Sequence, residues 1–114
     1  MGNGLERLDK LPRAILAHTP TPTEHLPNLS AKIGGAVLYV KRDDCTGLAL
    51  GGNKARQLEY YIGDALSQDA DTILITGAVQ SNFVRAAAAA AARYGLACHI
   101  QLEERVKSED ALYR

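Results

Sequence analysis

Residues 51–54 read Gly-Gly-Asn-Lys and join a glycine-rich loop to the first turn of a helix. Apolar residues recur at helical spacing from Lys54 to about Ser67, and Asn53 stands before them as the predicted N-cap. A lysine is unusual there, because the helix N-terminus carries partial positive charge and unpaired N–H groups. Two interpretations are open: a solvated lysine that tolerates a small electrostatic cost, and a reactive amine that forms a Schiff base.

The segments around this helix predict an α/β fold. A second helix is expected between Ser81 or Asn82, either of which can cap it, and Tyr94, where Gly95 ends it. Short apolar runs predict three strands: Val37–Arg42, Thr72–Thr76 and Ala97–Leu102. The second run is continuously apolar, as in a strand buried on both faces. Strands that alternate with helices indicate a parallel sheet with right-handed crossovers.

Parallel sheets of this kind bind ligands at the carboxyl ends of their strands, beside helix N-termini. The loops at those ends are residues 43–54 and 77–82. The lysine and the cluster Gln80-Ser81-Asn82 are therefore predicted to share one edge of one sheet. This cluster either receives an anion or simply caps the helix. No histidine lies near Ser81 in the sequence, which argues against a hydrolase triad.

The two ends of the chain differ from this α/β part. All four prolines lie within the first 30 residues, and residues 18–23 should be extended. A short helix is expected from Leu26 to Gly34, and the charged residues 103–114 end on what looks like an unfinished helix. Residues 41–44, Lys-Arg-Asp-Asp, form either an ion-pair cluster that frames the loop or a solvated strand end.

Composition excludes several classes of function. Lys plus Arg and Asp plus Glu both number 13 in the 114 residues, and this balance argues against nucleic-acid and membrane-surface binding. The two cysteines are far apart and have no Cys/His cluster around them, so no metal site is predicted. The N-terminus is polar, and the longest small apolar run, Ala86–Ala92, is too short to span a bilayer. A soluble cytoplasmic protein is expected.

Three segments together resemble one enzyme family. They are Lys-Arg-Asp-Asp at 41–44, Gly-Gly-Asn-Lys-Ala-Arg-Gln-Leu-Glu at 51–59, and Gly-Ala-Val-Gln-Ser-Asn at 77–82 with Arg85 and the alanine helix after it. The pattern is similar to the pyridoxal-phosphate enzymes that include D-cysteine desulfhydrase, L-cysteate sulfo-lyase and 1-aminocyclopropane-1-carboxylate deaminase. The resemblance runs from about Leu11 onward. It implies a three-layer, parallel-sheet α/β fold of fold type II, like the tryptophan synthase β subunit.

The resemblance also implies roles for five residues. Lys54 matches the Schiff-base lysine that holds pyridoxal 5′-phosphate covalently and then moves the substrate's Cα proton. Asn53 and Asn82 match residues beside the cofactor ring, and Asn82 matches the one that hydrogen-bonds its 3′-oxygen. Gln80, Ser81 and Asn82 match the residues that receive the substrate carboxylate. Ser81 matches a serine that serves some members as nucleophile or proton carrier.

The implied reaction releases ammonia from a small amino acid. Residues 45–48 and the Cys98-His-Ile stretch most resemble the cysteine and cysteate lyase branch of the family, and this resemblance implies β-elimination from D-cysteine or L-cysteate, which gives pyruvate. Deamination of 1-aminocyclopropane-1-carboxylate is the alternative, and Ser81 would take a larger part in it. Phe83 departs from the family, which commonly has histidine or glutamine there. The apolar ring removes a polar partner beside the carboxylate site and would also suit a catalytically incomplete paralogue.

Family members are much longer, and their phosphate-binding glycine loop lies beyond the position of Arg114. We therefore expect residues 1–36 to be an arm that packs on a missing large domain, and 37–114 to be an incomplete small α/β domain. The full-length enzyme is expected to be a homodimer that acts on a small amino acid. The chain alone is expected to be inactive, to bind pyridoxal phosphate poorly, and to associate or have low stability.

Overall fold

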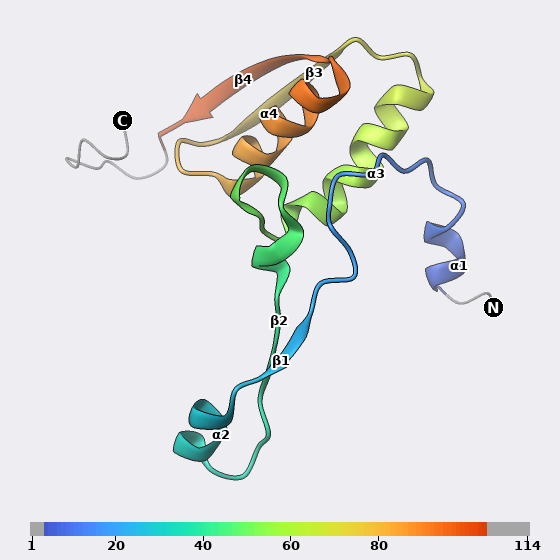
Figure 1. The fold of residues 1–114 in the computed structure, drawn as a ribbon. Coiled ribbons are helices and arrows are strands. Elements are labelled where there is room, and N and C mark those ends of the chain that lie inside the picture. The colour runs from blue at the N-terminus through green and yellow to red at the C-terminus, as the bar shows by residue number, and fades with distance from the viewer. Residues whose placement is uncertain (1–3, 105–114) are drawn as a thin grey trace.

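The computed structural model describes residues 4–104 and consists of an α/β body with an extended arm below it (Figure 1). The body contains α3 (Lys54–Ser67), β3 (Thr72–Ala78), α4 (Asn82–Tyr94) and β4 (Ala97–Glu103). The preceding elements are α1 (Gly4–Leu8), β1 (Thr23–His25), α2 (Pro27–Ile33), β2 (Tyr39–Lys41) and two 3-10 turns, η1 (Asp43–Thr46) and η2 (Leu48–Leu50). The three longer helix predictions are confirmed, as are the second and third predicted strands.

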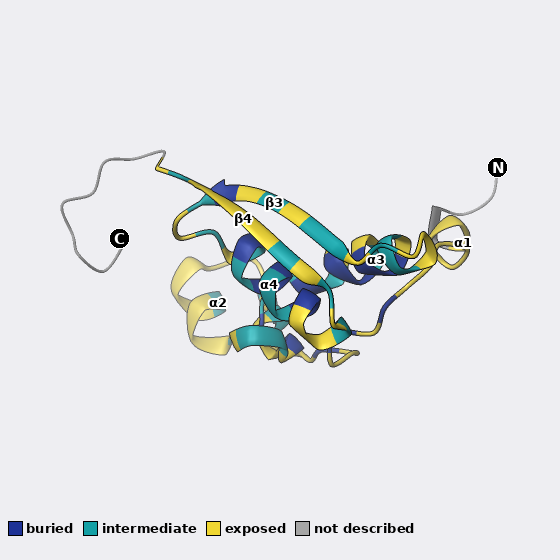
Figure 2. Ribbon diagram, turned by 90° about the horizontal axis from the view of Figure 1, so that it is seen from above, coloured by how far each residue is buried: buried dark blue, intermediate teal, exposed yellow. Residues whose placement is uncertain are grey.

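The sheet of the body is parallel, as predicted. Ile73 of β3 lies opposite Cys98 of β4, and Ile75 lies opposite Ile100. Helix α4 makes the crossover between the strands, and α3 and α4 lie on the same face of the sheet (Figure 2). The described residues thus supply two layers of an α/β fold.

The core lies between that face of the sheet and the two helices. Ala87, Ala90 and Ala91 of α4 are fully buried, and Leu58 and Ile62 of α3 are 2% exposed. Alanine is a strong helix former and its small side chain lets a helix approach its neighbours closely. The alanine run is therefore explained by packing.

The prediction of a third parallel strand is wrong. β2 pairs with β1 in antiparallel register, with Glu24 opposite Val40, and this pair lies in the arm away from β3 and β4 (Figure 1). A short apolar run fits either kind of pairing, and pairing with a strand close in sequence requires the closure of a shorter loop. Residues 43–54 therefore do not follow a strand of the parallel sheet.

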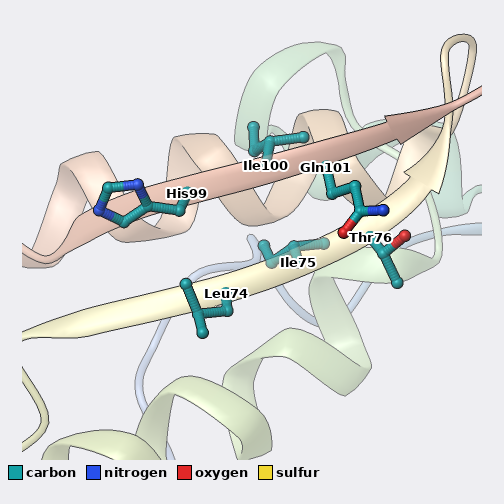
Figure 3. Close-up of a pocket in the computed structure, with 6 residues that line it drawn as sticks. All are labelled: Leu74, Ile75, Thr76, His99, Ile100 and Gln101. Carbon is teal, nitrogen blue, oxygen red and sulfur yellow. The ribbon is translucent and has the colours of Figure 1, made fainter.

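The prediction that β3 is buried on both faces is also wrong. Leu74 is 80% exposed, because the described helices cover only the other face of the sheet. A pocket of 460 Å³ lies over the open face. Its lining residues are Leu74, Ile75, Thr76, His99, Ile100 and Gln101 (Figure 3).

Part of residues 1–36, the predicted N-terminal arm, packs against the body of this chain. Ala14, Leu16 and Ala17 are at most 6% exposed and lie in the core or beside it, whereas no residue of α2 is buried. The division of the chain at residue 36 stays a prediction, and the predicted helix at the C-terminal end falls on residues 105–114, outside the described ones. Between residues 4 and 104, every helix is too short or too polar to cross a membrane.

Candidate functional site

The loop before α3 has an unusual backbone. Four consecutive residues have positive φ angles: Ala49 (45°), Leu50 (72°), Gly51 (76°) and Gly52 (119°). Left-handed backbone costs a residue with a side chain roughly 1–3 kcal/mol, and such strain concentrates at functional sites. Main-chain hydrogen bonds hold this loop, from Gly51 N to Leu48 O at 3.0 Å and from Gly52 N to the Asp43 carbonyl at 2.9 Å.

The two glycines serve different purposes. A Cβ atom at Gly51 would lie 1.9 Å from the carbonyl oxygen of Asp44, so only glycine fits there. A Cβ atom at Gly52 would meet no atom within 4 Å. The backbone at Gly52 therefore faces open space, which leaves room for a flat ligand to approach it.

An ion pair between Arg56 and Asp43 holds the start of the loop before α3. The Arg56 guanidinium binds both carboxylate oxygens of Asp43, with Nη2–Oδ1 at 2.7 Å and Nε–Oδ2 at 2.9 Å. This bidentate pairing lowers the pKa of Asp43. Arg42 pairs with Asp44 and Glu24 on the surface. Of the two interpretations of residues 41–44, the ion-pair cluster is correct.

Lys54 is the first residue of α3 and is half-buried. No hydrogen bond or ion pair joins its amine to another residue of the described part of the chain. Asn53 occupies the N-cap position as predicted, but its side chain makes no capping hydrogen bond. Its φ of −67° and ψ of −17° are helical, whereas a capping residue is typically extended. Both polar groups thus remain free for other contacts.

The start of α4 carries the second set of polar groups. Ser81 Oγ accepts a hydrogen bond from Val84 N at 3.3 Å, which confirms Ser81 as the N-cap. Asn82 follows as the first helical residue and is exposed, and its Oδ1 accepts a bond from Arg85 Nη2 at 3.2 Å. Gln80 is exposed in the turn before the helix. Capping by Ser81 leaves the hydroxyl proton itself available as a donor.

The glycine loop and the start of α4 are neighbours in space. η2 packs against α4, and Arg85 Nη2 lies 3.4 Å from the carbonyl oxygen of Gly51 (Figure 1). The two predicted loops therefore meet, although a helix–loop contact joins them rather than a shared sheet edge. The residues predicted from the sequence lie in these two loops or in the first helical residue after each: Asn53, Lys54, Gln80, Ser81 and Asn82.

One important residue was not predicted. Glu59 is 1% exposed, and its Oε1 accepts hydrogen bonds from Leu16 N at 3.0 Å and Ala17 N at 2.8 Å. Its other oxygen pairs with Arg13. Burial raises the pKa of this carboxyl, but the two N–H groups and Arg13 outweigh burial and leave the pKa lowered. Its sequence signal was a carboxylate on the apolar face of α3, beside Ile62.

Phe83 lies on another side of α4 from Asn82 and Arg85. Its ring meets Tyr61 of α3 edge to face, with 6.4 Å between centroids. It lines a second pocket, of 400 Å³, together with residues of α3 and β3 such as Ile73. The aromatic ring is thus used in packing between elements of the body. Neither pocket is lined by Lys54 or by residues 80–82.

Comparisons with known proteins identify the family of this chain. The family model described as "Pyridoxal-phosphate dependent enzyme" matches residues 14–113. Curated proteins named "1-aminocyclopropane-1-carboxylate deaminase" are 51% identical: that of Bradyrhizobium sp. (strain ORS 278) over 109 residues and that of Rhizobium leguminosarum bv. viciae over 108. These matches cover 94% and 93% of this chain but 32% of each relative.

A solved structure is also similar to this chain. It is titled "Crystal Structure Analysis of the ACC deaminase homologue", and it matches with a TM-score of 0.81 and 47% identity. The match covers 90% of this chain and 31% of that one. The chain thus spans about a third of the length of the proteins that it resembles.

Proposed function

This chain belongs to the pyridoxal-phosphate dependent enzymes, and we propose that it carries the lysine-bearing part of the active site of a 1-aminocyclopropane-1-carboxylate deaminase. Its cofactor is pyridoxal 5′-phosphate, and its fold is the α/β fold of fold type II. The 51% identity to curated deaminases carries the proposal. It favours the alternative drawn from the sequence over β-elimination from D-cysteine or L-cysteate, which has no specific support.

The residues present fit this cofactor. Gly52 leaves open space in front of its backbone, and the Lys54 amine in the next turn has no partner among the described residues. Lys54 would hold the cofactor covalently, with Asn53 beside the ring and Asn82 donating to a ring oxygen. When bound, the cofactor supplies an electron sink for the bond that breaks at the substrate's Cα.

The chain's own groups suit the substrate named by the relatives. The N-terminal N–H groups of α4 and the Gln80 amide can receive a carboxylate. In 1-aminocyclopropane-1-carboxylate the α carbon carries no hydrogen, so no Cα proton can be removed. The Lys54 amine and the Ser81 hydroxyl are then the groups that move a proton at a ring methylene. This gives Ser81 a larger part than in β-elimination.

The activity is tested in the full-length protein. With 1-aminocyclopropane-1-carboxylate we expect ammonia and 2-oxobutyrate in equal amounts, since hydrolytic ring opening of this substrate yields both. Pyruvate formed from D-cysteine or L-cysteate, without turnover of the cyclopropane substrate, would instead support the elimination reaction.

Lys54→Ala tests the lysine assignment. We expect the visible absorbance of the lysine-bound cofactor to disappear together with activity. Lys32→Ala, which changes an exposed lysine of α2, is the control and should alter neither. If the absorbance survived Lys54→Ala, another residue would hold the cofactor.

We also propose the setting in which the enzyme acts. Two free cysteines, Cys45 and Cys98, suit the reducing cytoplasm. A homodimer is proposed for the full-length protein, on the family resemblance. The 114-residue chain alone is proposed to be inactive, because it spans 32% of the length of the deaminases that it matches.

A further inference from the structure

Arg85 occupies a place that is unfavourable for a cation. It lies in the first turn of α4, where the helix N-terminus already carries partial positive charge. Its acceptors within residues 4–104 are neutral oxygens, whereas Arg13, Arg42 and Arg56 each pair with a carboxylate. Its Nη1 is buried and has no acceptor in the described part of the chain. A buried unpaired N–H is destabilising, so stability alone does not explain this arginine.

The contact with Asn82 fixes the orientation of an amide. Arg85 Nη2 donates to Asn82 Oδ1 at 3.2 Å, so the Asn82 NH₂ group points away from the guanidinium. A flipped amide would bring its own N–H groups against those of the guanidinium. Asn82 is exposed, so the two N–H donors of its amide are accessible to a ligand at the start of α4.

The contact with Gly51 reaches the other half of the site. The same Nη2 lies 3.4 Å from the Gly51 carbonyl oxygen, in the loop whose backbone runs through four positive φ angles. Gly51 stands three residues before Lys54. One guanidinium nitrogen thus bridges the amide at the start of α4 and the loop that leads to the lysine.

We propose that Arg85 is a positioning residue, which holds the Asn82 amide as a donor toward the cofactor and ties the Gly51 loop to α4. The proposal rests on the proposed function, because it needs pyridoxal phosphate as the group that accepts from Asn82. A lysine at position 85 would keep the charge, but its ammonium group lacks the rigid, planar arrangement of N–H donors that fixes the direction of Nη2 toward its two acceptors.

A double-mutant cycle in the full-length protein tests this. The readouts are the affinity for pyridoxal phosphate and the visible absorbance spectrum of the bound cofactor. We expect Arg85→Met to weaken affinity about tenfold and Arg85→Lys to restore little of it. In an Asn82→Ala background Arg85→Met should weaken affinity clearly less than in the wild type, and the loss that remains reports the contact with Gly51. Arg93→Met is the matched control, since Arg93 lies on the same helix and donates to a carbonyl, that of Leu16. It should leave affinity and spectrum unchanged.

Other results overturn the proposal. Additive losses in the cycle would show that Arg85 does not act through Asn82, and full rescue by Arg85→Lys would show that charge alone matters. A wild-type protein that binds no pyridoxal phosphate would refute the proposed function instead. In that case the side-chain NH₂ resonances of Asn82 in ¹⁵N-labelled protein still decide the matter: they should shift in Arg85→Met, and unchanged resonances would refute the positioning role.

Discussion

Glu59 shows how a single buried carboxylate attaches a segment without regular structure to a helix. Residues 13–17 form no helix or strand, yet Leu16 and Ala17 donate their backbone N–H groups to this side chain. Buried backbone donors need partners, and here a side chain provides them. Helical spacing puts Glu59 on the same face of α3 as Leu58 and Ile62, but only the position of residues 13–17 shows what it binds.

Glu59→Gln should destabilise the protein by about 2 kcal/mol, because it replaces charge-assisted hydrogen bonds by weaker ones and leaves Arg13 unpaired. The pKa of Glu59 is lowered from its ordinary 4.5 in the folded state. Its contribution is therefore complete above that value and is lost as pH falls through the lower folded-state pKa. In urea unfolding across this pH range, the free energy of unfolding should fall less steeply with decreasing pH in the variant than in the wild type.

Asp64→Asn is the matched control for Glu59→Gln, since Asp64 is an exposed acid on the same helix. It should change stability by less than about 0.5 kcal/mol. Equal effects of the two substitutions, or an unaltered acid limb in Glu59→Gln, would contradict the role given to Glu59.

The two glycines of the loop should respond differently to alanine. Gly51→Ala forces a Cβ atom against the Asp44 carbonyl and should cost about 3 kcal/mol or more. Gly52→Ala meets no atom and should cost about 1–2 kcal/mol of backbone strain, but it fills the space in front of the loop. We therefore expect weaker pyridoxal phosphate binding by the Gly52→Ala full-length protein.

Gly95→Ala separates strain from ligand contact. Gly95 also has a positive φ, 71°, and open surroundings, but it ends α4 far along the chain from the loop. It should lower stability by about 1 kcal/mol and leave cofactor titrations unchanged. Equal affinity losses in Gly52→Ala and Gly95→Ala would mean that the open space at Gly52 is not used.

At the scale of elements, periodicity and helix signals predicted the body of the fold well. The apolar spacing after Lys54 gave α3 its bounds, and Gly95 marked the end of α4. Strand partners were less predictable: residues 37–40 are apolar, as in an inner strand, yet β2 pairs with β1. A strand's apolar residues indicate that it is paired, but its partner depends on the path of the whole chain.

The cap of α4 allows the two roles of Ser81 to be separated. Ser81→Ala should cost about 1 kcal/mol, since it removes the acceptor for Val84 N. Ser81→Asn should restore that stability, because asparagine caps as well as serine, but it has no hydroxyl proton to transfer. We expect both variants to lose deaminase activity. Thermal melts of the full-length protein measure the stability changes, and ammonia assays measure the activity. If Ser81→Asn were active, the role of Ser81 would be limited to capping α4.

At the scale of the molecule, the sequence predicted two loops that contact one another in the structure, but it did not predict the contact that joins them. The loops that carry residues 53–54 and 80–82 are joined by a contact between Arg85 and Gly51. The spacing of Asn82 and Arg85, three residues apart on a helix, allows their hydrogen bond. The link to Gly51 depends on how α4 packs against η2, which no local pattern contains.

The uncovered face of the sheet formed by β3 and β4 (Figure 2) leads us to expect that the 114-residue chain self-associates. A parallel sheet is normally covered on both faces, yet Leu74 is 80% exposed. We expect the chain to self-associate in sedimentation velocity, and Leu74→Lys to reduce association while the thermal melt is unchanged. Ile75→Lys, one residue along the strand, should instead lower the melt, because Ile75 packs against the core. A wild-type chain that is monomeric and melts sharply and reversibly would contradict this, since an open apolar face would then carry no cost.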